Sequence, residues 1–113
     1  MEDRIEMLEF QMELLFNNSA LDRYLYETKI TREEYRALMD IMNLFRDKLD
    51  NGEKVYSSDY ERRVYEAVPK MNRNYHFCEL FAKMLAEDGR WEEVFPALYG
   101  DSPKYKDYLR NNK

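Results

Sequence analysis

The chain has little of what catalytic and secreted proteins commonly use: its 113 residues include one cysteine, one histidine and three glycines. A single cysteine cannot form an internal disulfide, which fits a disulfide-stabilised mini-protein badly and favours a reducing cytosol. The chain has no glycine-rich phosphate loop and no G-x-S-x-G, H-E-x-x-H or C-x-x-C pattern. The common short signatures of nucleotide binding, serine hydrolysis, zinc proteolysis and thiol redox chemistry are therefore absent.

Long apolar runs and an excess of basic charge are also missing. No apolar stretch approaches the roughly 20 residues of a membrane-spanning helix, and the first ten residues, MEDRIEMLEF, carry acids where a signal peptide is basic. The net charge of −5 disfavours general binding to nucleic acid or anionic membranes, because such binding depends on neutralising phosphates. We expect a cytoplasmic protein with no membrane contact, for which nucleic acid is an unfavoured partner.

Residues that favour strands are scarce, since isoleucine, valine and threonine number only three, four and two. Helix formers such as glutamate, leucine, methionine and lysine are abundant. A chain of this length has room for one domain. We therefore predict an all-α fold over residues 1–113, a single multihelical bundle of five or six helices with no sheet.

Helix start signals divide the first half of the chain. An apolar pattern predicts a first helix over about residues 3–16, and Ser19 is placed to cap a short helix over ALDRYLYETK. Thr31 and Glu34 have the spacing of a capping box and predict a helix over 32–49, which Gly52 ends. The core positions expected on that helix are Tyr35, Leu38, Met42, Phe45 and Leu49.

Similar helix start and stop signals occur in the second half of the chain. Ser58 and Glu61 have capping-box spacing and predict a helix that Pro69 stops. A further helix is predicted over 75–87, ending at Gly89, with core positions Phe77, Leu80, Phe81, Met84 and Leu85. The segment RWEEVFPALYG predicts a short helix interrupted by Pro96. We predict that residues 101–113 form a short helix or tail, with Ser102 as a cap and Pro103 at the first helical position.

The stretch NYHFCEL contains both the only histidine, His76, and the only cysteine, Cys78. Residues two apart on a helix point about 200° apart, so these two side chains cannot meet on one helical face. His76 and Glu79 can, but zinc needs three or four ligands and the chain has no second histidine. We expect no catalytic, metal or cofactor site within the chain, and Cys78 as a small buried apolar residue. A symmetric site shared between subunits is the alternative.

The first helix has more apolar surface than one small domain needs. Met1, Ile5, Leu8, Met12 and Leu15 follow the alternating spacing of four and three residues that marks a helix–helix seam, and Phe10, Leu14 and Phe16 widen the surface beyond it. We interpret one side as facing the domain and the other as facing a second subunit. The spacing fits a two-fold dimer and also allows a trimer. The interface residues that we predict are Ile5, Leu8, Met12, Leu15 and Phe16.

Three segments in order, RIEMLEFQMELL, ITREEYRALMDIMNLFRDKL and MLAEDGRWEEVF, resemble the YhaI-like proteins, short all-helical proteins of Bacillus-type bacteria. The similarity covers about residues 4–98 and leaves the tail after Gly100 outside. It implies an intracellular, all-α, self-associating protein, and it brings no activity, substrate or cofactor. We predict a non-catalytic protein that acts by homo-oligomerisation or by binding another protein. The alternatives are a small transcription-associated regulator contacting nucleic acid or a DNA-binding partner, and an enzyme with a site shared between subunits.

Overall fold

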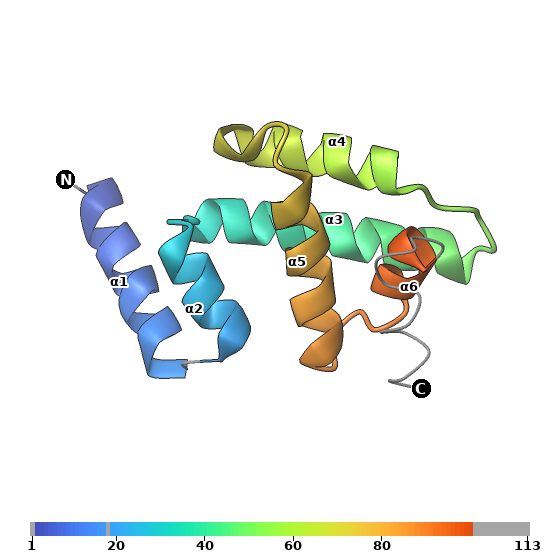
Figure 1. Ribbon diagram of the computed structural model, residues 1–113. Coiled ribbons are helices and arrows are strands. Elements are labelled where there is room, and N and C mark those ends of the chain that lie inside the picture. Colours follow the sequence, from blue (N-terminus) through green and yellow to red (C-terminus); the bar gives the residue numbers. More distant parts are fainter. Residues whose placement is uncertain (1, 18, 101–113) are drawn as a thin grey trace.

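Six α-helices and one 3₁₀ turn form the regular structure in the computed structural model, which describes residues 2–17 and 19–100, with side chains in the first helix from Arg4 onward. In chain order they are α1 (Glu2–Asn17), α2 (Ala20–Glu27), α3 (Arg32–Asp50), α4 (Ser57–Ala67), η1 (Pro69–Met71), α5 (Tyr75–Glu87) and α6 (Val94–Tyr99). The predicted all-α fold is confirmed over this range (Figure 1). Met1 of the predicted seam and the predicted helix or tail at 101–113 lie outside the described residues.

Side-chain caps begin the helices α2, α3 and α5. The Thr31 hydroxyl accepts from the Glu34 main-chain N–H at 3.0 Å, while the Glu34 carboxylate accepts from the Thr31 N–H at 2.9 Å, so the predicted capping box is present. Ser19 caps α2 as predicted, and Asp22 completes a second box there. Asn74 caps α5 through its side-chain oxygen, which accepts from the Phe77 N–H at 3.1 Å. Each cap satisfies N–H groups that the helix itself leaves unpaired.

Two predictions about helix boundaries are wrong. Ser58 does not cap α4, because the helix begins at Ser57 and the extended residue Tyr56 precedes it without a side-chain cap. The Tyr60 N–H already bonds the Tyr56 carbonyl oxygen at 3.2 Å, so the first turn closes around Ser58 instead of starting there. Pro96 does not interrupt α6, because it is the third helical residue and its missing N–H lies in the turn that has no intrahelical acceptor.

Glycines end α3 and α5 in left-handed geometry. Gly52 and Gly89 both have φ of +76°, a region that disfavours residues with a Cβ. After Gly52, the N–H of Glu53 bonds back to the carbonyl oxygen of Lys48 at 2.8 Å, which is the bond expected of a glycine-terminated helix. The predicted end of the central helix at Gly52 is therefore confirmed.

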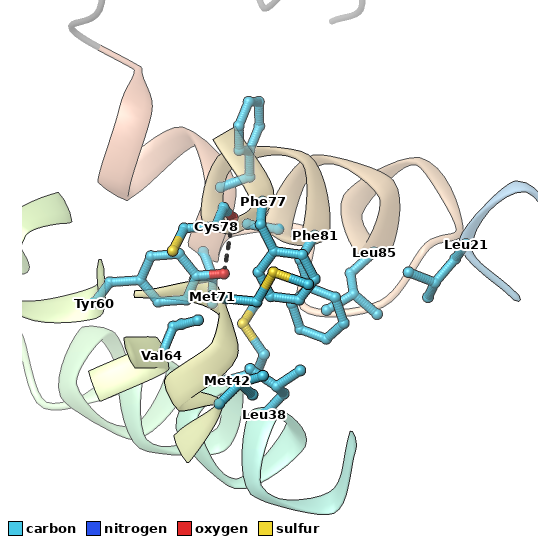
Figure 2. Close-up of a cluster of buried hydrophobic side chains, with 14 of the residues drawn as sticks. Leu21, Leu38, Met42, Tyr60, Val64, Met71, Phe77, Cys78, Phe81 and Leu85 are labelled. Carbon is cyan, nitrogen blue, oxygen red and sulfur yellow. Dashed lines mark hydrogen bonds between the residues drawn. The ribbon is translucent and has the colours of Figure 1, made fainter. Parts of the chain in front are cut away.

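The core lies where α3, α4, α5 and α6 meet, and it continues through Leu21 and Leu25 of α2 to Phe10 and Leu14 of α1. Figure 2 shows part of this cluster. The α3 positions Leu38, Met42 and Phe45 are fully buried, as the sequence predicts, while Tyr35 and Leu49 are partly buried at its margins. Figure 2 shows Leu38 and Met42 below Met71, Phe77 and Phe81, with Tyr60 and Val64 of α4 alongside. The α5 core positions Phe77, Phe81 and Leu85 are also buried, whereas Leu80 and Met84 are half-buried.

The helices α1 and α2 lie side by side at one end of the molecule, away from α4 and α6 (Figure 1). The central helix α3 starts beside them and runs to the opposite end, and α5 crosses α3. As a result, α1 packs against α2 and the start of α3, and its opposite side faces outward (Figure 1).

Candidate interaction surface

The side of α1 that faces away from the molecule is apolar. Its side chains retain large exposed fractions: Ile5 54%, Leu8 53%, Met12 70%, Leu15 49% and Phe16 90%. These are the five residues that the sequence predicts as an interface, and the structure places all of them on one helix, exposed together. At about 100° per residue they span an arc of roughly 100°, which we call the outer face.

The opposite side of α1 holds the helix against the body. Phe10 and Leu14, each 3% exposed, are its fully buried members and point about 180° from the middle of the outer face. The structure therefore shows which residues belong to each of the two apolar sides of α1. Phe10 and Leu14 face the domain, whereas Phe16 lies with the predicted seam.

A guanidinium group at the start of α3 anchors this inner side. The Arg32 side chain donates to the Glu13 carboxylate at 2.8 Å, and its guanidinium carbon lies 5.1 Å from the centre of the Phe10 ring. This hydrogen bond lowers the pKa of Glu13 below its usual value. Phe10 also packs against Tyr35, with ring centres 6.0 Å apart. Sequence reasoning did not identify Arg32, because its partner lies 19 residues away with no local pattern linking the two.

Charges of opposite sign border the outer face. On the helical wheel, Glu9 follows Phe16 along one edge, while Arg4 lies beside Leu15 along the other. Both side chains are exposed. No hydrogen bond or ion pair joins either of them to another described residue. The outer face is thus an apolar strip bordered on one edge by the Glu9 carboxylate, which interacts electrostatically with Arg32, and on the other by the Arg4 guanidinium.

A cleft of about 290 Å³ lies on the inner side, between α1, α3 and the segment after α5. Its charged lining is largely paired, since Arg32 binds Glu13, and Arg90 binds Asp88 and donates to the Tyr35 hydroxyl at 3.2 Å. Arg36 and Asp22 complete its charged lining. No buried polar side-chain atom among the described residues lacks a hydrogen-bond partner.

The histidine and the cysteine of NYHFCEL are separated by burial. His76 is exposed in the first turn of α5, whereas Cys78 is fully buried beside Tyr60 (Figure 2). Burial, reinforced by the nearby Glu61 carboxylate, raises the pKa of the Cys78 thiol to about 12. The thiol is therefore protonated at neutral pH and lacks the thiolate that nucleophilic chemistry needs. The interpretation of Cys78 as a buried apolar residue agrees with this environment.

Two further kinds of functional element are absent from the residues that the structure describes. No group of three or more histidine, cysteine, aspartate or glutamate side chains is placed to hold a metal ion within residues 2–17 and 19–100. Over the same part of the chain, none of the helices has both the length and the apolar character needed to cross a bilayer.

Comparisons with protein-family models, curated protein sequences and solved structures give no match for this chain. The resemblance to the YhaI-like proteins is therefore carried by the three sequence segments alone and stays a prediction.

Proposed function

We propose that this chain is a non-catalytic cytoplasmic protein that self-associates through the outer face of α1. The observation that carries the proposal is the exposure of five large apolar side chains, between 49% and 90%, on one side of a single helix. Soluble monomers seldom expose contiguous apolar patches larger than a few hundred Å². Burying the outer face against another surface would remove it from water and stabilise the assembly.

A second copy of the chain is the occupant that the outer face fits best. Ile5, Leu8, Met12 and Leu15 have the spacing with which one helix packs its side chains between those of an identical helix. The edges carry both signs of charge, Glu9 and Arg4, so the surface is electrostatically complementary to itself. A two-fold interface requires such self-complementarity, because the same patch serves both subunits.

The position of α1 supports this arrangement. The helix packs against α2 and α3 on the side that carries the buried Phe10 and Leu14, so the body of the subunit lies behind the outer face. Figure 1 shows α1 at the edge of the molecule beside α2. Two subunits joined through α1 therefore place their bodies on opposite sides of the contact, without mutual obstruction. The resemblance to the YhaI-like proteins carries the same expectation of self-association.

Light scattering of the purified protein tests the proposal. We expect the mass to rise from the 13.9 kDa of one chain toward a multiple of it across roughly 1–200 μM, since small interfaces commonly give micromolar dissociation constants. Leu8→Glu should hold the mass at that of one chain, because it places a charge in the middle of the outer face. Its helical circular dichroism should be retained, since Leu8 is 53% exposed.

Tyr75→Glu is the matched control. Tyr75 is 58% exposed, like Leu8, but lies at the start of α5, so this variant should associate as the wild type does. A wild-type mass of one chain at every concentration would refute self-association. If the monomeric wild type then captured a different protein and Leu8→Glu did not, the outer face would belong to a heterologous partner.

A further inference from the structure

We infer that α1 pairs with the α1 of a second copy in parallel, about a two-fold axis that runs along the helices, with Arg4 of each beside Glu9 of the partner subunit. This inference rests on the proposed self-association and adds the orientation and the charge pair that fix it. It follows from which residues border the outer face and from their register.

The outer face defines the register of a two-heptad seam. Ile5 and Met12 occupy the first core position of each heptad, and Leu8 and Leu15 occupy the second. The positions that flank the core are then Arg4 and Gln11 on one edge and Glu9 and Phe16 on the other. Apart from Gln11, which is half-buried, all the members of both sets are exposed. The flanking residues decide orientation, because the core residues pack in either direction.

A parallel pairing brings opposite charges together. In a parallel two-stranded coil, each flanking residue on the first edge meets the residue five positions further along on the partner. Arg4 therefore meets Glu9 of the partner subunit, and Gln11 meets Phe16 of the partner subunit. The two-fold axis generates each contact twice. Phe16, the most exposed side chain of the face, gains cover from the partner in this arrangement.

An antiparallel pairing brings like charges together. In that orientation each edge meets the same edge of the partner, and the middle of the helix lies on the axis. Glu9 then lies opposite Glu9 of the partner subunit, and Arg4 is separated from both carboxylates. Facing like charges destabilise an interface, so this orientation is disfavoured relative to the parallel one.

The core residues also bear on the number of helices. A β-branched residue at the first core position with leucine at the second favours two parallel strands; Ile5, Leu8 and Leu15 follow that preference, whereas Met12, at the other first core position, does not. A dimer moreover leaves each body free, because α2 and α3 pack on the side of α1 that carries the buried Phe10 and Leu14, opposite the seam. The parallel dimer therefore satisfies charge, core and body placement together.

Disulfide trapping distinguishes the orientations. The only native thiol, Cys78, is fully buried, so an introduced surface cysteine is the reactive one. In the parallel dimer, residue 12 faces its own copy, and Met12→Cys should form a covalent dimer in a glutathione buffer; Leu8→Cys should do the same. In an antiparallel dimer residue 8 faces residue 12, and only a mixture of the two variants would form disulfides efficiently. Tyr75→Cys, remote from α1, controls for random collisions.

Charge exchange supplies a second measurement. Arg4→Glu should raise the dissociation constant by roughly 2- to 30-fold, the range expected for two exposed ion pairs, and the double variant Arg4→Glu/Glu9→Arg should restore it. Selective disulfide formation between residues 8 and 12, or unchanged affinity in Arg4→Glu, would overturn the parallel pairing while self-association still held. A wild-type protein that never exceeds one chain in mass would instead refute the proposed function itself.

Discussion

The hydroxyl group of Tyr60 donates a hydrogen bond to the main-chain carbonyl oxygen of Cys78, 3.0 Å away, and joins α4 to α5 in the centre of the core. Tyr60 is fully buried, and its ring meets Phe45 and Tyr99 edge-on, with centres 5.7 and 6.3 Å apart. One side chain therefore holds α4 to three other helices, α3, α5 and α6. The bond is the dashed line in Figure 2.

Removing that hydroxyl should weaken the fold without leaving a large cavity. Tyr60→Phe keeps the ring contacts and deprives the Cys78 carbonyl of its donor in a dry environment, so we expect a loss of about 1–2 kcal/mol in the free energy of unfolding. Urea denaturation followed by circular dichroism measures it. Tyr56→Phe is the control, because Tyr56 is 56% exposed and should change stability little. Equal stability of both variants would show that the bond contributes nothing.

Two residues with the same predicted role should behave differently. Thr31→Ala removes a cap that accepts from Glu34 at 3.0 Å and should lower the free energy of unfolding by about 0.5–2 kcal/mol. Ser58→Ala should change it by less than about 0.5 kcal/mol, because Ser58 lies inside the first turn of α4 and is exposed. Thermal and urea unfolding of both variants test this, and a larger loss for Ser58→Ala would contradict the structure.

Stability should fall in alkaline solution. Burial raises the pKa of Cys78 to about 12 and that of Tyr60 well above its usual value, so the folded state keeps protons that the unfolded chain releases above about pH 8.5 for a thiol and 10 for a tyrosine. The free energy of unfolding should therefore be constant to about pH 8, decline beyond it, and decline more steeply above pH 10. Urea titrations from pH 7 to 11 measure the profile. Cys78→Ala should remove the decline between pH 8.5 and 10, and an unchanged profile would refute the assignment.

Self-association predicts that thermal stability depends on concentration. Association of folded subunits raises the melting temperature as the protein concentration increases. Met12→Lys should abolish this dependence and leave the melting temperature at low concentration unchanged, because Met12 is 70% exposed in the single chain. Calorimetry at several concentrations measures both. A lower melting temperature for Met12→Lys under dilute conditions would show that Met12 stabilises the subunit itself.

The regulator alternative predicts nucleic-acid binding, and we expect none tighter than about 1 μM at roughly 150 mM salt. The chain carries a net charge of −5, and one of its cations, Lys70, is paired with Glu34 at 3.2 Å. Fluorescence anisotropy with labelled duplex and single-stranded DNA measures the affinity. Sub-micromolar binding that weakens steeply with added salt would favour the regulator instead.

Local signals explain which parts of the fold the sequence predicts. The Thr31 and Glu34 pair sits directly before the long apolar stripe of α3, so cap and burial agree on one helix start. Ser58 and Glu61 have the same spacing, but the buried residues Val55 and Tyr60 set the path of the chain, and the helix starts earlier. A capping pattern alone does not reveal which neighbouring side chains the tertiary structure must bury.

The interaction surface is predictable to a similar degree. Spacing alone identifies an apolar strip and places Phe10, Leu14 and Phe16 beyond it. It does not say which side the body occupies, because that depends on where α2 and α3 pack. The structure separates Phe16 from Phe10 and Leu14 by burial, and it adds Arg32, whose contact with Glu13 spans residues distant in the chain.

The modest attachment of α1 to its own subunit has a consequence for dynamics. Phe10 and Leu14 are its fully buried side chains, so α1 should open and close as a local unfolding unit more readily than α3 or α5. Its amide hydrogens would then exchange with solvent early when subunits are separate and late when they are joined. The fraction of molecules in which α1 is folded would thus rise with protein concentration. A high local concentration of the protein would stabilise its N-terminal helix.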